Sequence, residues 1–248
     1  MPDLLTSDGI RLSERRWPAH PVASATVVLV HGFTGSKDHP DLVAVAQALV
    51  GAGYGVLSYD ARGHHDSDGL CTLGESEELD VAAAVAEARS VSKRVVTVGA
   101  SMGGIAVLRH ARTDPTLNGV VTVSTPAEWK LPRNIQGLFS MAISQTGVGR
   151  WWAERRLGVR LDSGWNHPPP PVKVAADIRS PLAVVHGAAD RMIPASEAKR
   201  LARGAGGPTR LEIVEGMGHS FDRRGIPAIV GAVRWVLDPG HDSGVVSA

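Results

Sequence analysis

The 248-residue sequence has a single cysteine, few aromatic side chains and no excess of charge of either sign. Cys71 has no second cysteine with which to form an internal disulfide, and a zinc site of the usual cysteine spacing is excluded. No apolar run approaches the roughly 18 residues that indicate a transmembrane helix. The 26 basic and 25 acidic residues form no long block of like charge. Neither nucleic acid nor an anionic membrane is therefore expected as a partner.

The start of the chain and its composition point to an ordinary globular protein. A basic stretch followed by an apolar stretch is missing from the amino-terminal residues, so we predict no signal peptide and expect a cytoplasmic location. The length suits a single domain spanning residues 1–248. Hydrophobic residues make up 43% of the chain, but aromatic residues only 4%. This composition favours buried Val-rich strands with closely packed helices of small residues.

Short apolar runs alternate along the chain with stretches of helical periodicity. The residues around Ser7-Asp8-Gly9 predict a β-hairpin, because Asp-Gly suits a tight turn. Further strands are predicted within residues 25–32, 55–63, 93–101, 118–125, 180–187 and 208–216. Helices are predicted within residues 40–54, 75–90, 102–112, 196–203 and 227–236. The alternation predicts an α/β fold with a mostly parallel central sheet and helices on both faces.

One segment, residues 126–177, interrupts this alternation. It carries four of the six tryptophans, Trp129, Trp151, Trp152 and Trp165. We predict a short helical cap folded over the strand ends, in which aromatic side chains shape an apolar pocket for an acyl group. The alternative is a packed satellite with a small core of its own.

The stretch VGASMGG places Ser101 between a predicted buried strand and a predicted helix. A sharp strand-to-helix turn requires small residues two positions before and after a nucleophilic serine, and Gly99 and Gly103 meet this requirement. The turn lifts the hydroxyl off the sheet beside a helix N-terminus, whose field favours developing negative charge. Ser101 is the candidate nucleophile.

A serine nucleophile needs a base and an acid that orients the base. His219 lies in the Gly-bracketed stretch GMGHSF, directly after the last predicted strand. Asp190 lies in HGAADRMIP, in the loop after the preceding strand. The chain order Ser101, Asp190, His219 is the order that this serine motif predicts. We therefore predict His219 as the base and Asp190 as the acid.

The same chemistry needs two backbone N–H groups to bind an oxyanion. Met102, directly after the nucleophile, supplies one in this prediction. The stretch HGFTGS after the first long strand supplies the other from Phe33, and Gly32 and Gly35 let the backbone approach the substrate.

The stretches HGFTGS, YDARGH, GASMGG, HGAADRMIP and GMGHSF, taken together, resemble the α/β-hydrolase superfamily. The likeness covers about residues 25–237 and is strongest to small serine esterases, lysophospholipases and monoacylglycerol-lipase-like enzymes. It implies an α/β-hydrolase fold and the same roles for Ser101, Asp190, His219, Phe33 and Met102. It also implies two-step acyl transfer without a metal or other cofactor.

The sequence departs from many such relatives at His65, where they have glycine. This loop usually borders the active site, so His65 could narrow or polarise the entrance; the alternative is a structural or solvated role. The adjacent letters His64-His65-Asp66 also suggest a metal site, but no second cluster of ligands accompanies them, and we predict no metal.

The expected partner is a small acyl ester, cleaved at its carboxylic ester bond. Thioesterase, amidase and perhydrolase reactions use the same residues and stay open as alternatives, because a fold does not choose among them. A binding or receptor protein that keeps the fold without turnover is a further alternative. The sequence does not specify the oligomeric state.

Overall fold

The computed structural model describes residues 3–18, 23–129, 146–164 and 166–240. Its strands are β1 (Asp3–Leu5), β2 (Arg11–Trp17), β3 (Thr26–Val30), β4 (Gly55–Tyr59), β5 (Val95–Ala100), β6 (Gly119–Val123), β7 (Leu182–Gly187) and β8 (Thr209–Val214). Its helices are α1 (Pro40–Gly51), α2 (Glu77–Val91), α3 (Met102–Thr113), α5 (Gly147–Leu157), α6 (Pro171–Ala176), α7 (Ala195–Gly204) and α8 (Ile226–Leu237), with a short 3₁₀ helix at Arg223–Gly225.

The strands form one eight-stranded sheet in the order β1-β2-β4-β3-β5-β6-β7-β8. Strands β3 to β8 pair in parallel, whereas β1 and β2 form the predicted hairpin and β2 joins β4 antiparallel. Gly9 in the hairpin turn has a φ of 83°, which glycine adopts without steric strain. The predicted mostly parallel sheet is confirmed.

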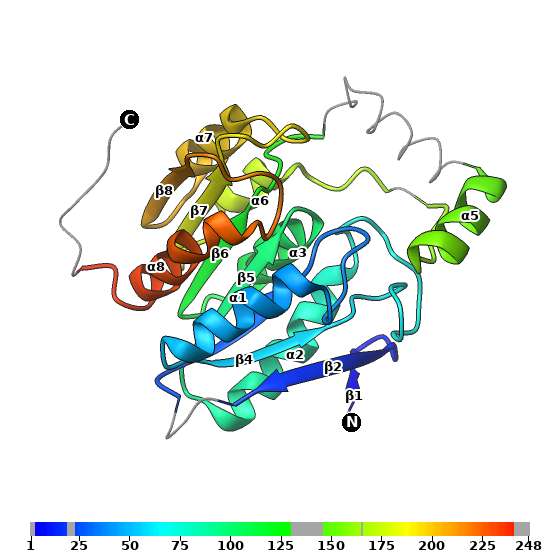
Figure 1. Cartoon of the computed structure of the whole chain (residues 1–248), viewed down its shortest axis with the longest axis horizontal. Helices are drawn as coiled ribbons and strands as arrows, with labels where there is room; N and C mark the ends of the chain where they lie inside the picture. The colour runs from blue at the N-terminus through cyan, green and yellow to red at the C-terminus, as the bar shows by residue number, and fades with distance from the viewer. Residues whose placement is uncertain (1–2, 19–22, 130–145, 165, 241–248) are drawn as a thin grey trace.

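Helices cover both faces of the sheet, as the alternation predicted (Figure 1). Successive side chains of a strand point to opposite faces, and β3 illustrates the result. Val28 and Val30 join the apolar cluster under α2, α3, α6 and α7, whereas Val27 and Leu29 join the cluster under α1 and α8. All five residues of β3 are buried. A strand buried on both faces explains why the sequence shows a continuous apolar run there.

Segment 126–177 contains α5 and α6, and α5 lies at the edge of the molecule, away from the sheet (Figure 1). The chain after α5 is joined to the loop after β4 by isolated bridges between His64 and Val159 and between Cys71 and Leu161. Residues 130–145 and Trp165 of the predicted cap lie outside the described residues.

Candidate active site

Ser101 stands on a strained turn between β5 and α3. Its φ of 52° and ψ of −115° are unusual for a residue with a side chain, and such strained positions are concentrated at functional sites. A Cβ atom at Gly99 would overlap the backbone of Gly103, and one at Gly103 would overlap the carbonyl oxygens of Val30 and His31. The two glycines are therefore required by the close approach of α3 to the ends of β3 and β5.

The loop after β3 lies directly against this turn. A Cβ atom built on Gly32 would be 3.2 Å from the Cβ of Ser101. Within the described part of the chain, neither the Phe33 N–H nor the Met102 N–H donates a hydrogen bond to another protein group. The two predicted oxyanion donors thus lie in the loop after β3 and at the first residue of α3, beside Ser101, and both N–H groups are available.

His31 fixes the shape of the loop after β3, which contains Phe33, through hydrogen bonds of its imidazole. Its Nδ1 donates to the Gly32 carbonyl oxygen at 2.7 Å, and its Nε2 accepts from the Ala61 N–H at 3.0 Å. Burial lowers the pKa of His31 to about 4, so the imidazole is neutral at pH 7 and can make both bonds. The sequence motif contained His31, but its bridge to the loop after β4 could not be inferred from the motif.

Asp190 and His219 are hydrogen-bonded, with 2.8 Å between Oδ2 and Nδ1. The other carboxylate oxygen, Oδ1, accepts from the N–H groups of Met192 at 2.8 Å and Ile193 at 2.9 Å. Burial opposes ionisation of this side chain, but the bonds from His219 and the two N–H groups outweigh burial and lower the pKa of Asp190. The carboxylate is therefore charged at neutral pH and orients the imidazole, which is 20% exposed.

The loops that carry Asp190 and His219 are bonded to each other. The Ala189 N–H donates to the Met217 carbonyl oxygen at 2.9 Å. A side chain at Gly187 would overlap the backbone of Met217 and Gly218, so the two loops pass in direct contact. This contact at the ends of neighbouring strands explains why an acid and a base that lie 29 residues apart meet.

Asp222 holds the His219 loop, and the sequence analysis missed it. Its Oδ2 accepts from the Gly218 N–H and its Oδ1 from the Arg224 N–H, both at 2.9 Å. These two backbone bonds lower the pKa of Asp222. An aspartate just before a short helix is a common capping residue, and this is the pattern that could have revealed it.

Asp60 follows β4 at the same edge of the sheet, and its carboxylate is paired with the ammonium group of Lys37. The Lys37 Nζ lies 2.7 Å from Oδ2, and the Lys37 N–H donates to Oδ1 at 2.8 Å. Both side chains are almost fully buried. This pair ties the loop after β3 to the end of β4 and gives Asp60 a structural role.

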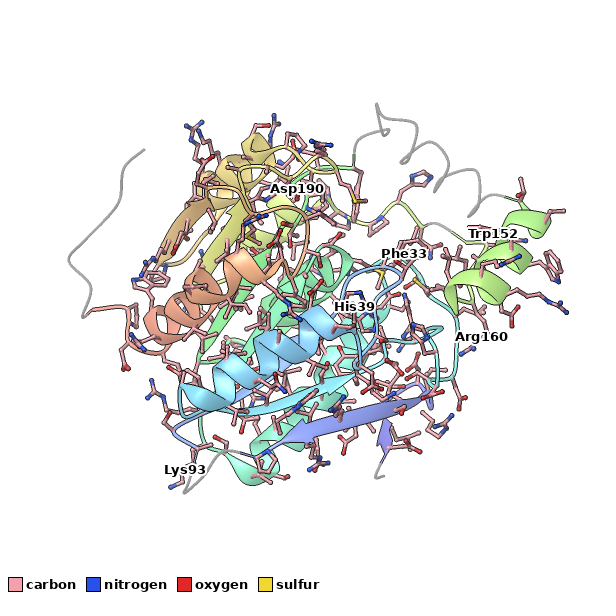
Figure 2. The ribbon with its side chains drawn as sticks, viewed as in Figure 1. Phe33, His39, Lys93, Trp152, Arg160 and Asp190 are labelled. Atoms are coloured by element: carbon pink, nitrogen blue, oxygen red, sulfur yellow. The ribbon has the colours of Figure 1, made fainter. Side chains whose placement is uncertain are left out.

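The four predicted pocket residues have different surroundings. His65 is exposed, and its N–H donates to the Gly158 carbonyl oxygen at the end of α5. Trp129 donates from Nε1 to the Pro168 carbonyl oxygen at 2.7 Å. Trp151 is 55% exposed, with the Arg155 guanidinium 5.0 Å from its ring centroid, whereas Trp152 packs against the core. Figure 2 shows Phe33 and Asp190 at the same edge of the sheet, with Trp152 on the outlying α5.

The described residues offer neither a metal site nor a membrane span. No group of three or more His, Cys, Asp or Glu side chains in ranges 3–18, 23–129, 146–164 and 166–240 is placed to hold a metal ion. Among the same residues, no helix combines the length and apolar character needed to cross a bilayer.

Comparison with solved structures identifies the fold. The chain superposes on an esterase of Pyrococcus furiosus with a TM-score of 0.73 at 22% identity, covering 96% of this chain and 91% of that one. Est1E from Butyrivibrio proteoclasticus, solved with ferulic acid bound, gives a TM-score of 0.69 at 19% identity over 94% and 96% of the two chains. A thermophilic esterase from Thermogutta terrifontis gives 0.70 at 20% identity over 97% and 99%. The protein has the α/β-hydrolase fold.

Comparison of sequences identifies the family. The chain belongs to the hydrolase family described as serine aminopeptidase, S33, whose model matches residues 21–163. The quorum-quenching protein AidA of Acinetobacter baumannii is 37% identical over 113 residues, which are 42% of this chain and only 36% of that protein. An uncharacterized protein of Mycobacterium tuberculosis is 29% identical over 220 residues, 87% of this chain and 70% of that protein.

Proposed function

We propose that the protein is a serine hydrolase that cleaves carboxylic esters through an acyl-enzyme on Ser101. The observation that carries this proposal is the Asp190–His219 hydrogen bond of 2.8 Å, at the sheet edge where Ser101 occupies its strained turn. The available N–H groups of Phe33 and Met102 beside that turn support it further. A nucleophile, a base with its orienting acid and two oxyanion donors are the parts that acyl transfer needs.

We propose two-step acyl transfer on these groups. His219 accepts the Ser101 proton on Nε2 as Oγ attacks the carbonyl carbon, and the oxyanion accepts hydrogen bonds from Phe33 and Met102. His219 then gives the proton to the leaving alkoxide. In the second half, His219 deprotonates a water that attacks the acyl carbon, and Ser101 recovers its proton. Asp190 stays ionised throughout and stabilises the imidazolium.

An ester is the substrate class that we favour because the structural relatives described above are esterases. The family description, serine aminopeptidase, supports an amide or peptide bond as the second candidate. The likeness to a quorum-quenching protein adds a small signalling molecule to the substrates worth testing. Thioesterase and perhydrolase reactions need the same groups, and a non-catalytic binding protein of this fold is the alternative of a different class.

Fluorophosphonate labelling tests the proposal directly. The native protein is expected to label, and Ser101→Ala to lose labelling together with hydrolysis of short-chain and medium-chain aryl esters. Ser124→Ala is the matched control, because Ser124 also follows a parallel strand and also has a positive φ of 49°. Native protein that resists the probe and hydrolyses esters no faster than Ser101→Ala would contradict the proposal.

A substrate panel then separates the candidates. Aryl esters, thioesters, aminoacyl anilides and lactones are compared by kcat/KM, with Ser101→Ala as the background in each assay. Esters are expected to be the best substrates. Anilides that exceed the esters would favour a peptidase, and lactones that exceed both would favour a cyclic signalling ester.

A further inference from the structure

His186 is a buried histidine that the proposed reaction does not use. It lies in β7, its side chain is fully buried, and its Nε2 is 2.9 Å from the Ile193 carbonyl oxygen. The same nitrogen lies 3.6 Å from Oδ2 of Asp190, which is beyond hydrogen-bond length. His186 therefore packs against the Asp190 carboxylate without donating a hydrogen bond to it.

The bond to Ile193 fixes the tautomer of His186. A carbonyl oxygen only accepts hydrogen bonds, so Nε2 must carry the hydrogen. In the part of the chain that the structure describes, the buried Nδ1 has no hydrogen-bond partner. Through Nε2, His186 is therefore a hydrogen-bond donor to Ile193.

The His186 bond stabilises the loop that contains Asp190. Ile193 is bound from both sides: its carbonyl oxygen accepts from His186, and its N–H donates to Oδ1 of Asp190 at 2.9 Å. The Asp190 N–H in turn donates to the Gly187 carbonyl oxygen at 3.2 Å. The carboxylate is left with Oδ2 directed at His219. Loss of the His186 bond would release Ile193, and with it one of the two N–H groups that set the orientation of the carboxylate.

We propose that His186 is a positioning residue, which acts through Ile193 to hold the Asp190 carboxylate in the orientation that His219 requires. The inference rests on the proposed function, because it assigns Asp190 its role as the orienting acid. Among the described residues, the basic side chains within 4.0 Å of this carboxylate are those of His186 and His219. No other side chain in that part of the chain competes for the same two oxygens.

Two amide substitutions separate a positioning role from a merely structural one. The amide of His186→Gln reaches about as far as Nε2 and can still donate to Ile193, whereas the amide of His186→Asn reaches only about as far as Nδ1. His110→Asn is the matched control, since His110 is also buried, lies at the far end of α3, and has an Nδ1 without a partner among the described residues. Circular dichroism and thermal unfolding check that all three variants fold.

Two readouts are measured on the whole protein. The first is kcat and KM on the best ester. The second is the downfield proton NMR signal of the His219 Nδ1–H in the free protein, which Asp190→Ala should abolish. We expect His186→Asn to lower kcat by roughly tenfold to a hundredfold at nearly unchanged KM, as a displaced catalytic group does, and to broaden the signal. His186→Gln and His110→Asn should keep both close to native.

The inference fails if folded His186→Asn keeps native kcat and a native signal, or if His186→Gln loses as much as His186→Asn does. If His186→Asn does not fold, native behaviour of His186→Gln supports the donor role, and a broadened signal in folded His186→Gln overturns it. Failure of the proposed function is a separate result. In that case the native protein hydrolyses no ester, while the NMR comparison of native, Asn and Gln proteins still decides whether His186 positions Asp190.

Discussion

The ends of the parallel strands and segment 126–177 are built in different ways. At the strand ends, backbone atoms touch so closely that a side chain at Gly99, Gly103 or Gly187 would overlap neighbouring main chain. In segment 126–177, Val148 and Trp151 on α5 are 78% and 55% exposed. α6 of the same segment is packed into the core, so the exposed part of the described segment is α5.

α5 and the chain directly after it nevertheless make specific contacts with the rest of the molecule. The Cys71 N–H donates to the Arg160 carbonyl oxygen at 2.7 Å, the His65 N–H donates to the Gly158 carbonyl oxygen at 2.8 Å, and Ala153 is buried against the core. At the strand ends, the proposed chemistry therefore depends on contacts that tolerate no displacement. α5, which belongs to the segment that we predict to contact the acyl group, has exposed side chains that can change at little cost in stability.

The largest difference between the two regions is expected when a single carboxylate is neutralised. Asp190→Asn removes the charge that orients His219, and the corresponding change in a serine protease triad lowers kcat by about 10⁴-fold. The matched change Asp162→Asn lies in segment 126–177, where the carboxylate accepts from the nearby Gly164 N–H. Steady-state kinetics should show near-native kcat for Asp162→Asn. Equal losses in both variants would contradict the division between the regions.

The next largest effect concerns glycine. Gly103→Ala places a methyl group against the carbonyl oxygens of Val30 and His31, which belong to the main chain and cannot move aside. We expect the free energy of unfolding to fall by about 3 kcal/mol, the upper part of the usual range for overpacking, and ester hydrolysis to be lost. Urea denaturation followed by circular dichroism measures the change.

Gly147→Ala is the counterpart in segment 126–177. Gly147 is the first residue of α5, and no atom of the described residues lies within 4 Å of the position where its Cβ would be. The free energy of unfolding of the Gly147→Ala protein is expected to stay within about 0.5 kcal/mol of native. A Gly103→Ala protein as stable as Gly147→Ala would show that α3 is not packed as tightly against β3 as the structure indicates.

The sequence predicted the strand-end region well because its signals are local. Buried strands such as residues 25–32 show as continuous apolar runs, and the glycines around Ser101 show the steric demand of the turn directly. The contacts that cross between strands have no such local pattern. Three such contacts depend on which strand ends lie side by side: the Lys37–Asp60 pair, the His31–Ala61 bond and the His186–Ile193 bond. No single stretch of sequence specifies the order of the strands.

Segment 126–177 was harder to predict for a related reason. The sequence of α5 has no apolar face that repeats with helical spacing, and only Ala153 within it is fully buried. The tryptophans indicated a cap but not which of them would be covered. Trp151 and Trp152 are adjacent in the sequence yet differ in exposure, which only the placement of the helix determines.

Acid sensitivity is the third difference. His64 is fully buried beside Phe33 and His31, with ring centroids 6.1 Å and 4.9 Å away, and burial lowers its pKa to about 3. As the pH falls below 6.5, the unfolded chain gains a proton that the folded chain does not. The free energy of unfolding is therefore unaffected by His64 above pH 6.5 and falls as the pH is lowered from 6.5 toward 3. At pH 5, one such histidine lowers the free energy of unfolding by roughly 2 kcal/mol.

His64→Asn should remove the part of this acid-induced loss of stability that His64 causes. The Asn amide can still donate to the Arg62 carbonyl oxygen, as Nδ1 of His64 does at 3.1 Å, but it does not titrate. The free energy of unfolding in urea is compared at pH 7 and pH 5. The same substitution at the exposed His167 of segment 126–177 controls for the loss of a histidine as such. An unchanged difference between the two pH values in His64→Asn would mean that His64 is not held neutral by the fold.

The smallest effects are expected at the paired tryptophans of α5. Trp151→Ala removes an exposed ring that contacts the Arg155 guanidinium, so stability should change by no more than about 0.5 kcal/mol. Trp152→Ala removes a half-buried ring that packs against the core, and we expect a larger loss of stability together with a changed preference among acyl chain lengths. Because the two residues are adjacent on one helix, each is the control for the other. A chain-length profile of kcat/KM that both substitutions leave unchanged would show that α5 does not line the acyl pocket, and the tolerance of segment 126–177 would then extend to function as well as to stability.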